Sequence, residues 1–210
     1  MIQFTIKQND FLSKEIEAFS HTDYIGYDRR DEIENYPMYL LTLKNDVNRN
    51  WRESLLKDAQ KSLLAALSSD LPEIIDKIEP ENLTVCVVPR AKKENSYRKD
   101  QLLFKETIRI AVNKLGDDFI DGTQFISRHT NTKTTHLRRP IDDYDNDGSE
   151  PYPGISGNTC NFSENLRGRD ILLIDDIYTE NINIDEDMIQ ALLDCEANSV
   201  TFYAVGKTIH

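Results

Sequence analysis

Residues 169–208 read RDILLIDDIYTENINIDEDMIQALLDCEANSVTFYAVGKT, and this stretch carries the clearest fold signal in the chain. Its residues 171–174 (ILLI) form a continuous apolar run, which is typical of a strand buried on both faces of a sheet. The acidic pair Asp175-Asp176 follows directly. Apolar residues then recur at helical spacing over about 185–195, and 199–205 (SVTFYAV) returns to a strand pattern. The order strand, acidic pair, helix, strand predicts two parallel strands joined by a helix.

The segments before this stretch extend the same pattern. Residues 83–89 (LTVCVVP) form a second valine-rich run, and a basic loop leads from it to a helical pattern over about 99–115. A weaker strand signal lies within 119–127. Residues 129–165 are rich in Thr, Asn, Asp, Gly and Pro and predict a flexible loop, which is either a functional lid over a site or a disordered segment. We therefore expect an α/β fold, with a mainly parallel sheet flanked by helices and ligands bound at the carboxyl ends of the strands.

The N-terminal residues 1–80 are less regular. Residues 2–7 (IQFTIK) alternate like a short strand, whereas 11–19 (FLSKEIEAF) predict a short amphipathic helix. Apolar residues at helical spacing predict a helix over about 51–68 and a second one over 70–78. The expectation is a helical N-terminal extension or hood over residues 1–80, followed by an α/β core over residues 81–210.

The charge distribution is uneven. The chain of 210 residues has 25 basic and 37 acidic residues and a net charge of −12, which disfavours bulk nucleic-acid binding. Residues 86–139 nevertheless hold 12 basic and 6 acidic residues. This basic island suits either a solvated face or a pocket for a small anionic ligand, and a nucleic-acid surface is the weaker alternative.

Three features predict a cytoplasmic protein without a membrane segment. No apolar run approaches the roughly 20 residues that a bilayer-spanning helix needs. The first ten residues, MIQFTIKQND, lack the pattern of a secretory signal. The three cysteines are widely spaced and suit reduced thiols.

Residues 167–208 resemble the phosphoribosyl pyrophosphate signature of type I phosphoribosyltransferases. That signature is a buried strand, two acidic residues, a loop of Thr, Thr, Gly and Thr, and then a helix. Residues 83–139 are loosely similar to the competence-associated members of the family. The resemblance implies the type I phosphoribosyltransferase fold, phosphoribosyl pyrophosphate or a nucleotide as the ligand, Mg²⁺ as the cofactor, and phosphoribosyl transfer to an acceptor that the sequence does not identify.

Regulatory members of the family leave a second reading open. The chain would then be a non-catalytic nucleotide sensor or an assembly protein, with a homodimer or a protein partner.

The resemblance also assigns roles to residues. The carboxylates of Asp175 and Asp176 would accept hydrogen bonds from the ribose hydroxyls, help to hold Mg²⁺ and stabilise a cationic sugar. Arg128 and Lys133 are candidate ligand contacts at the start of the flexible loop. The basic loop after the first buried strand would bind pyrophosphate through Arg90, Lys92 and Lys93. The loop before the last helix would bind the 5′-phosphate through Tyr178, Thr179, Glu180, Asn181, Ile182 and Asn183.

This last loop departs from the family pattern Thr-Thr-Gly-x-Thr, because it reads Thr179-Glu180-Asn181-Ile182-Asn183. Asparagine is the residue that best replaces glycine at positive φ, so the backbone bend is expected to survive. Glu180 places a carboxylate near the expected phosphate and would repel it. Either Glu180 faces solvent, or the phosphate site is weakened, or the ligand lacks that phosphate.

Overall fold

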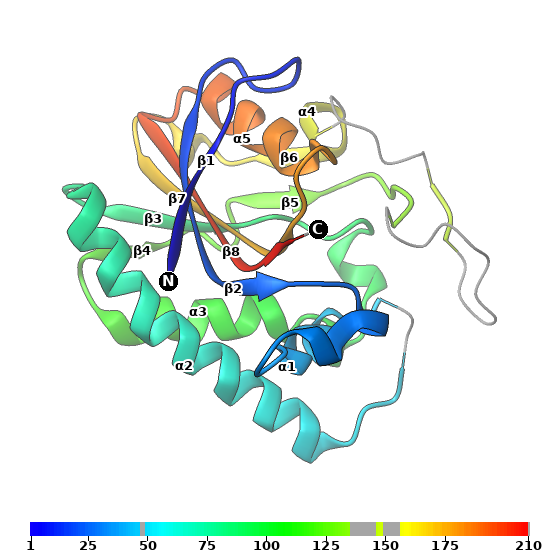
Figure 1. Ribbon diagram of the computed structural model, residues 1–210. Coiled ribbons are helices and arrows are strands. Elements are labelled where there is room, and N and C mark those ends of the chain that lie inside the picture. Colours follow the sequence, from blue (N-terminus) through cyan, green and yellow to red (C-terminus); the bar gives the residue numbers. More distant parts are fainter. Residues whose placement is uncertain (47–48, 135–145, 149–155, 210) are drawn as a thin grey trace.

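The protein is described by a computed structural model over residues 1–46, 49–134, 146–148 and 156–209. Within these residues a six-stranded sheet runs in the order β1-β2-β8-β7-β3-β4 (Figure 1). All neighbouring strands are parallel except β1 and β2. The strands of this sheet are β1 (Ile2–Ile6), β2 (Ile16–Tyr24), β3 (Leu83–Val87), β4 (Phe119–Asp121), β7 (Asp170–Tyr178) and β8 (Ser199–Thr208). A separate antiparallel pair is formed by β5 (Ile126–Arg128) and β6 (Cys160–Phe162).

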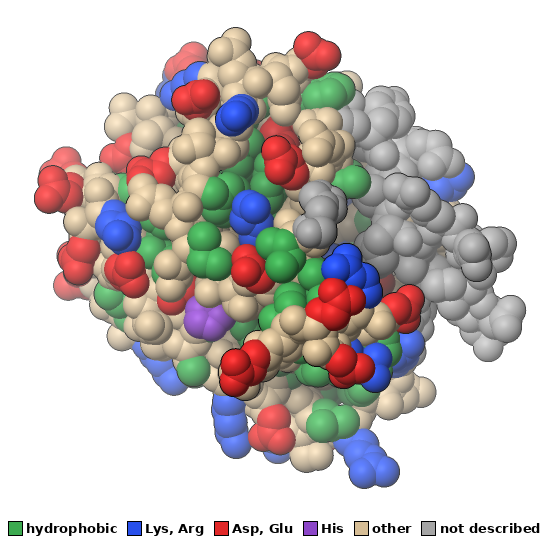
Figure 2. Space-filling model, viewed as in Figure 1, with side chains coloured by type: hydrophobic (Ala, Val, Ile, Leu, Met, Phe, Trp, Pro, Cys, Tyr) green, Lys and Arg blue, Asp and Glu red, His purple; other side chains and the backbone are tan. Residues whose placement is uncertain are grey.

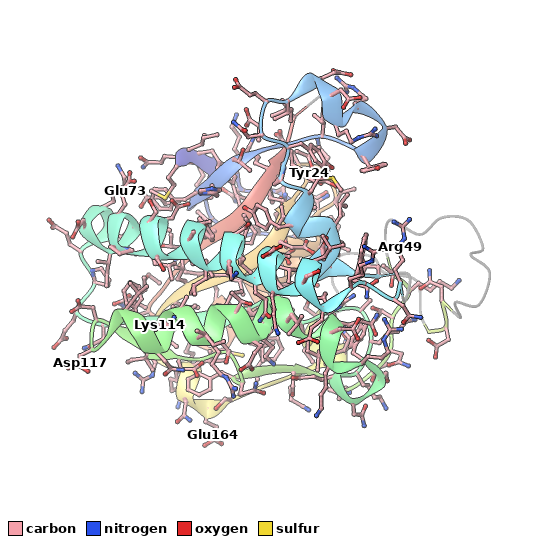
Figure 3. The ribbon with its side chains drawn as sticks, turned by 90° about the horizontal axis from the view of Figure 1, so that it is seen from below. Tyr24, Arg49, Glu73, Lys114, Asp117 and Glu164 are labelled. Atoms are coloured by element: carbon pink, nitrogen blue, oxygen red, sulfur yellow. The ribbon has the colours of Figure 1, made fainter. Side chains whose placement is uncertain are left out.

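Helices cover both faces of the large sheet. The helices α2 (Glu53–Ile78) and α3 (Leu103–Leu115) run side by side under one face, next to the shorter α1 (Met38–Lys44) (Figures 1 and 3). The opposite face carries α5 (Ile184–Asp194) and the single turn α4 (Ser156–Thr159). The expected α/β fold, with a mainly parallel sheet flanked by helices, is confirmed. Four short 3₁₀ turns complete the described helices: Tyr27–Glu32, Glu94–Ser96, Lys99–Gln101 and Glu164–Leu166.

The central strand β7 shows why the apolar run 171–174 folds as a buried strand. Leu172 and Ile174 pack into the core cluster on the side of α2 and α3. Ile171 and Leu173 pack into the cluster on the side of α5. Full burial of one such side chain stabilises the fold by about 1.5–3 kcal/mol, so the strand is held from both faces.

Residues 1–24 hold β1 and β2 of the large sheet, so the short strand predicted over 2–7 is confirmed, whereas the expected helical character of this segment is wrong. Residues 16–19 of the predicted helix lie in β2. Phe19 and Ala18 are completely buried on opposite faces of the sheet. The deciding interaction is the parallel pairing of β2 with β8, about 180 residues away in the chain. The long-range strand pairing therefore decides the structure of this segment, although its apolar residues have helical spacing.

The helix α2 is continuous where the sequence predicted two helices. Pro72 lies inside it, and a proline there removes one backbone hydrogen bond and costs about 3 kcal/mol. Leu67, Leu71 and Ile74 are fully buried on either side of the proline. Their combined burial outweighs that cost, so the helix passes through the proline.

The predicted flexible loop 129–165 is described only in part, because residues 135–145 and 149–155 lie outside the described residues. In the part of the chain that is described, none of the helices has both the length and the apolar character needed to cross a membrane.

Candidate functional site

The acidic pair lies where β3 ends and β7 continues. The register of β3 against β7 ends at Val87 and Ile174. The pairing of β7 with β8 continues as far as Tyr178 and Lys207. Asp175 and Asp176 therefore follow the last residue that β3 covers, beside the loop that leaves β3. This is the carboxyl end of a parallel sheet, the usual position of a ligand site in such folds.

An open cavity of about 170 Å³ lies at this edge of the sheet. Five residues predicted from the sequence line it together: Asp175, Asp176, Arg90, Arg128 and Lys133. The structure adds three charged residues that the sequence reasoning did not propose: Lys44, Asp46 and Asp187.

Lys44 is in direct contact with the acidic pair. It is the last residue of α1, and its Nζ lies 3.0 Å from Oδ1 of Asp176. Burial alone would lower the pKa of Lys44, but attraction to Asp176, Asp46 and Asp175 outweighs it, so this pKa lies above its ordinary value. Lys44 is therefore a permanent positive charge beside the acidic pair.

Asp175 has a different environment. Burial raises the pKa of Asp175 to about 7, and repulsion from Asp176 acts in the same direction. The backbone N–H of Asp176 donates a 2.8 Å hydrogen bond to Oδ1 of Asp175. Burial also raises the pKa of Asp185, in the first turn of α5, and repulsion from Asp175 acts in the same direction. Burial and repulsion between neighbouring carboxyl groups thus favour the protonated form at both positions.

Arg90 lines the cavity but is held by the protein. Its Nη2 lies 2.7 Å from Oδ1 of Asp46, and its Nη1 donates to the carbonyl of Gln101 at 2.5 Å. Its guanidinium also stacks on the ring of Tyr97 at 4.3 Å. A phosphate ligand would have to compete with Asp46 for this side chain.

Arg128 has neutral hydrogen-bond partners. Its Nε donates to the carbonyl of Arg90 at 2.6 Å, and its Nη1 donates to Oγ1 of Thr159 at 2.7 Å. Within the described ranges, no ion pair joins Arg128 to a carboxylate. A half-buried guanidinium with neutral partners favours an anion from outside the protein.

Lys92 and Lys93 do not line the cavity, although the sequence grouped them with Arg90. Lys92 is almost fully buried, and its Nζ bonds to the carbonyl of Asp147 and, at 2.8 Å, to its Oδ1. The backbone N–H of Lys93 donates to Oδ1 of Asn131 at 3.0 Å. These contacts join the loop after β3 to the loop after β5.

The loop over residues 179–183 keeps the bend expected of it. Asn181 and Asn183 have φ values of 69° and 61°, so asparagine does adopt the left-handed conformation where the family pattern has glycine. Glu180 is exposed to solvent. The predicted phosphate-binding residues of this loop, 178–183, do not line the cavity, whereas Ile184 and Asp187 of α5 do.

The first turn of α5 is acidic and partly buried. Asp185 and Glu186 are 7% and 3% exposed. The hydroxyl of Tyr178 donates a 2.9 Å hydrogen bond to Oε1 of Glu186. A helix N-terminus attracts negative charge, and here the side chains of the helix itself already supply it. Neither Asp185 nor Glu186 was predicted from the sequence as a site residue.

A resident metal ion does not fit these carboxylates as they stand. Asp176 is paired with Lys44, and burial favours the protonated form of Asp175, which is a poor cation ligand. Among the residues that the structure describes, no three His, Cys, Asp or Glu side chains are grouped so as to hold a metal. Mg²⁺ requires near-octahedral oxygen ligands, and one carboxylate paired with an ammonium beside one buried carboxyl group does not provide them.

Much of the basic island is paired internally. Acidic and basic side chains are interspersed on the face shown in Figure 2. This pairing reduces the charge available to a long polyanion such as nucleic acid. Three ion pairs of the island are Arg98–Asp100 at 2.9 Å, Lys105–Glu94 at 3.0 Å and Arg109–Glu106 at 2.7 Å.

Comparison with known proteins gives no family for this chain: no protein-family model matches it, and no curated protein matches it significantly.

Proposed function

We propose that the cavity binds a phosphorylated ribose, either phosphoribosyl pyrophosphate or a nucleotide, and that the protein transfers the phosphoribosyl group to an acceptor. The fold would then be that of the type I phosphoribosyltransferases. One observation carries the proposal: the Asp175-Asp176 pair shares a single cavity with Arg90, Arg128 and Lys133, which lie at or beyond the ends of β3 and β5.

The two kinds of charge suit the two parts of such a ligand. Carboxylates accept hydrogen bonds from the vicinal hydroxyls of a ribose. In the transfer, the bond between the anomeric carbon and the pyrophosphate breaks, and the pyrophosphate leaves with the electron pair. A nucleophilic atom of the acceptor then bonds to the anomeric carbon. Asp175 and Asp176 would stabilise the cationic sugar, and Arg128 would stabilise the developing charge of the pyrophosphate.

A second candidate function is nucleotide binding without catalysis, as in a sensor or an assembly protein. The loop before α5 favours it, because an exposed Glu180 and the buried acids Asp185 and Glu186 surround the place where the family binds a 5′-phosphate. This candidate predicts ligand binding without release of pyrophosphate.

Calorimetric titration with phosphoribosyl pyrophosphate tests the proposal. The wild-type protein should bind below millimolar concentration, and the double substitution Asp175→Asn with Asp176→Asn should abolish binding. The matched control is Asp117→Asn with Asp118→Asn, an exposed acidic pair beyond the end of α3 (Figure 3), which should leave binding unchanged. No binding to the wild-type protein at millimolar ligand would reject both candidate functions for this ligand.

Pyrophosphate release separates the two candidates. If the protein binds the ligand but releases no pyrophosphate with a broad panel of nucleobase and amine acceptors, the non-catalytic function is supported.

A further inference from the structure

We propose that Lys44 is an internal cation that takes the place of a divalent metal beside Asp175 and Asp176, so that the cavity binds its phosphorylated ligand without Mg²⁺. The identity of the ligand rests on the proposed function. The role of Lys44 rests on its own contacts.

The first argument is competition for one oxygen. Nζ of Lys44 lies 3.0 Å from Oδ1 of Asp176, and the two side chains are 24% and 17% exposed. Both residues line the cavity. A metal ion that bound this carboxylate would have to displace the ammonium or lie next to it, and two cations that share one oxygen repel each other strongly in a partly buried site.

The second argument is the number of carboxylates around Lys44. Asp46, Asp175 and Asp176 line the cavity together with Lys44, and Asp176 is in direct contact with its ammonium. A divalent ion at this position would be stabilised by the same three carboxylates. Lys44 thus provides the positive charge that these acids require.

The third argument is that the position of Lys44 is fixed by the core. Leu40 and Leu43 of α1 are completely buried against the sheet. Asn45 follows Lys44 in a left-handed conformation, and its side chain bonds to the carbonyl of Arg49 and to Asp100. The backbone that carries Lys44 is therefore fixed both before and after this residue.

The experiment has a ligand-free part and a ligand-binding part. In the first, Mn²⁺ binding to the free protein is measured by water proton relaxation, with Mn²⁺ standing in for Mg²⁺. Wild-type protein should bind Mn²⁺ weakly. Lys44→Gln should bind it about tenfold more tightly or better, and adding Asp176→Asn should remove the gain. Lys57→Gln is the matched control, because Lys57 is exposed and pairs with Glu53 on α2.

In the second part, phosphoribosyl pyrophosphate is titrated calorimetrically in EDTA and in Mg²⁺. The wild-type affinity should change little between the two conditions. Lys44→Gln should lose about tenfold or more in EDTA and recover with Mg²⁺, whereas Lys57→Gln should behave as the wild type. A circular-dichroism melt checks that the variants are folded. The comparison of wild-type affinity in EDTA and in Mg²⁺ tests the inference even if a variant fails to fold.

The outcomes separate this inference from the proposed function. Wild-type binding that requires Mg²⁺ would overturn the role of Lys44 and still support the proposed function. Absence of ligand binding in both conditions would overturn the proposed function, and the Mn²⁺ measurement would then decide: a gain in Lys44→Gln supports the metal-replacing role, and no gain overturns it.

Discussion

The phenolic hydroxyl of Tyr203 donates a 2.9 Å hydrogen bond to Oδ2 of Asp70, and Nδ1 of His21 lies 2.9 Å from the same oxygen. The contact ties β8 to α2 across the core, and both Tyr203 and Asp70 are almost completely buried. Tyr203→Phe removes one partner of a buried carboxyl group. We expect the free energy of unfolding to fall by about 1–3 kcal/mol, measured by denaturant unfolding.

Tyr39→Phe is the control for this prediction. The hydroxyl of Tyr39 is also buried but has no hydrogen-bond partner among the described residues. Its removal should leave the stability unchanged or raise it slightly. Equal losses in the two variants would show that the Tyr203–Asp70 hydrogen bond adds nothing.

Gly122 lies where a side chain does not fit. A Cβ atom at this position would lie 2.7 Å from Cγ2 of Thr84, 2.9 Å from Sγ of Cys86 and 3.0 Å from the carbonyl of Val85. Gly122→Ala should therefore cost about 1–3 kcal/mol of stability through overpacking. At Gly26, with φ −55°, nothing lies within 4 Å of such an atom, so Gly26→Ala should be neutral. Thermal melts of the two variants and the wild type measure this difference.

The stability of the protein should depend on pH through Asp175. Its pKa is raised from 3.8 to about 7 by burial and by Asp176. Between these two values the folded state holds a proton that the unfolded state has lost, so the free energy of unfolding falls as the pH rises. Each pH unit in this window costs about 1.4 kcal/mol for one fully shifted group, and above about pH 7 the contribution is constant.

Asp175→Asn tests this assignment, because it removes the titrating group and keeps the shape of the side chain. The variant should lose less stability than the wild type between about pH 4 and pH 7 and should be the more stable protein at pH 8. Parallel curves for the two proteins, from denaturant unfolding across this range, would contradict the prediction.

The parts of the fold that the sequence predicted well are those held by local signals. The run 171–174, the helix after it and the strand 199–205 are all present, because continuous apolar runs and helical spacing report burial directly. Residues 16–24 were missed because their partner strand β8 lies at the other end of the chain. The predicted break between the helices 51–68 and 70–78 was wrong, because the burial that keeps α2 continuous through Pro72 is tertiary.

The same division holds for the candidate site. Asp175, Asp176 and Arg90 could be predicted because each follows a recognisable buried strand. Lys44 could not be predicted, because it lies far from β7 in the sequence and no local pattern indicates its contact with Asp176. The burial of Asp185 was hidden for another reason: acids in a first helical turn are common for helix stability alone.

The altered loop before α5 gives a prediction that combines binding and backbone conformation. Glu180→Thr with Asn181→Gly restores the family pattern at two positions. Because Asn181 already has φ 69°, glycine there should keep the bend and leave the stability nearly unchanged, whereas Asn181→Ala should cost about 1 kcal/mol. If Glu180 repels a 5′-phosphate, the double variant should bind phosphoribosyl pyrophosphate more tightly. Unchanged affinity would show that the exposed Glu180 does not act on the ligand.

Arg128 should contribute more to anion binding than Arg90, although both line the cavity. The charge of Arg90 is already offset by Asp46 at 2.7 Å, whereas Arg128 donates to a carbonyl and a hydroxyl. Arg128→Gln should therefore weaken binding of phosphoribosyl pyrophosphate by about 1.5–3 kcal/mol, and Arg90→Gln by less. The affinity of the Arg128 variant should also depend less on salt. Arg109→Gln, an exposed residue of α3 paired with Glu106, serves as the control in the same titrations. Equal effects at positions 90 and 128 would show that the ligand displaces Asp46 at no net cost.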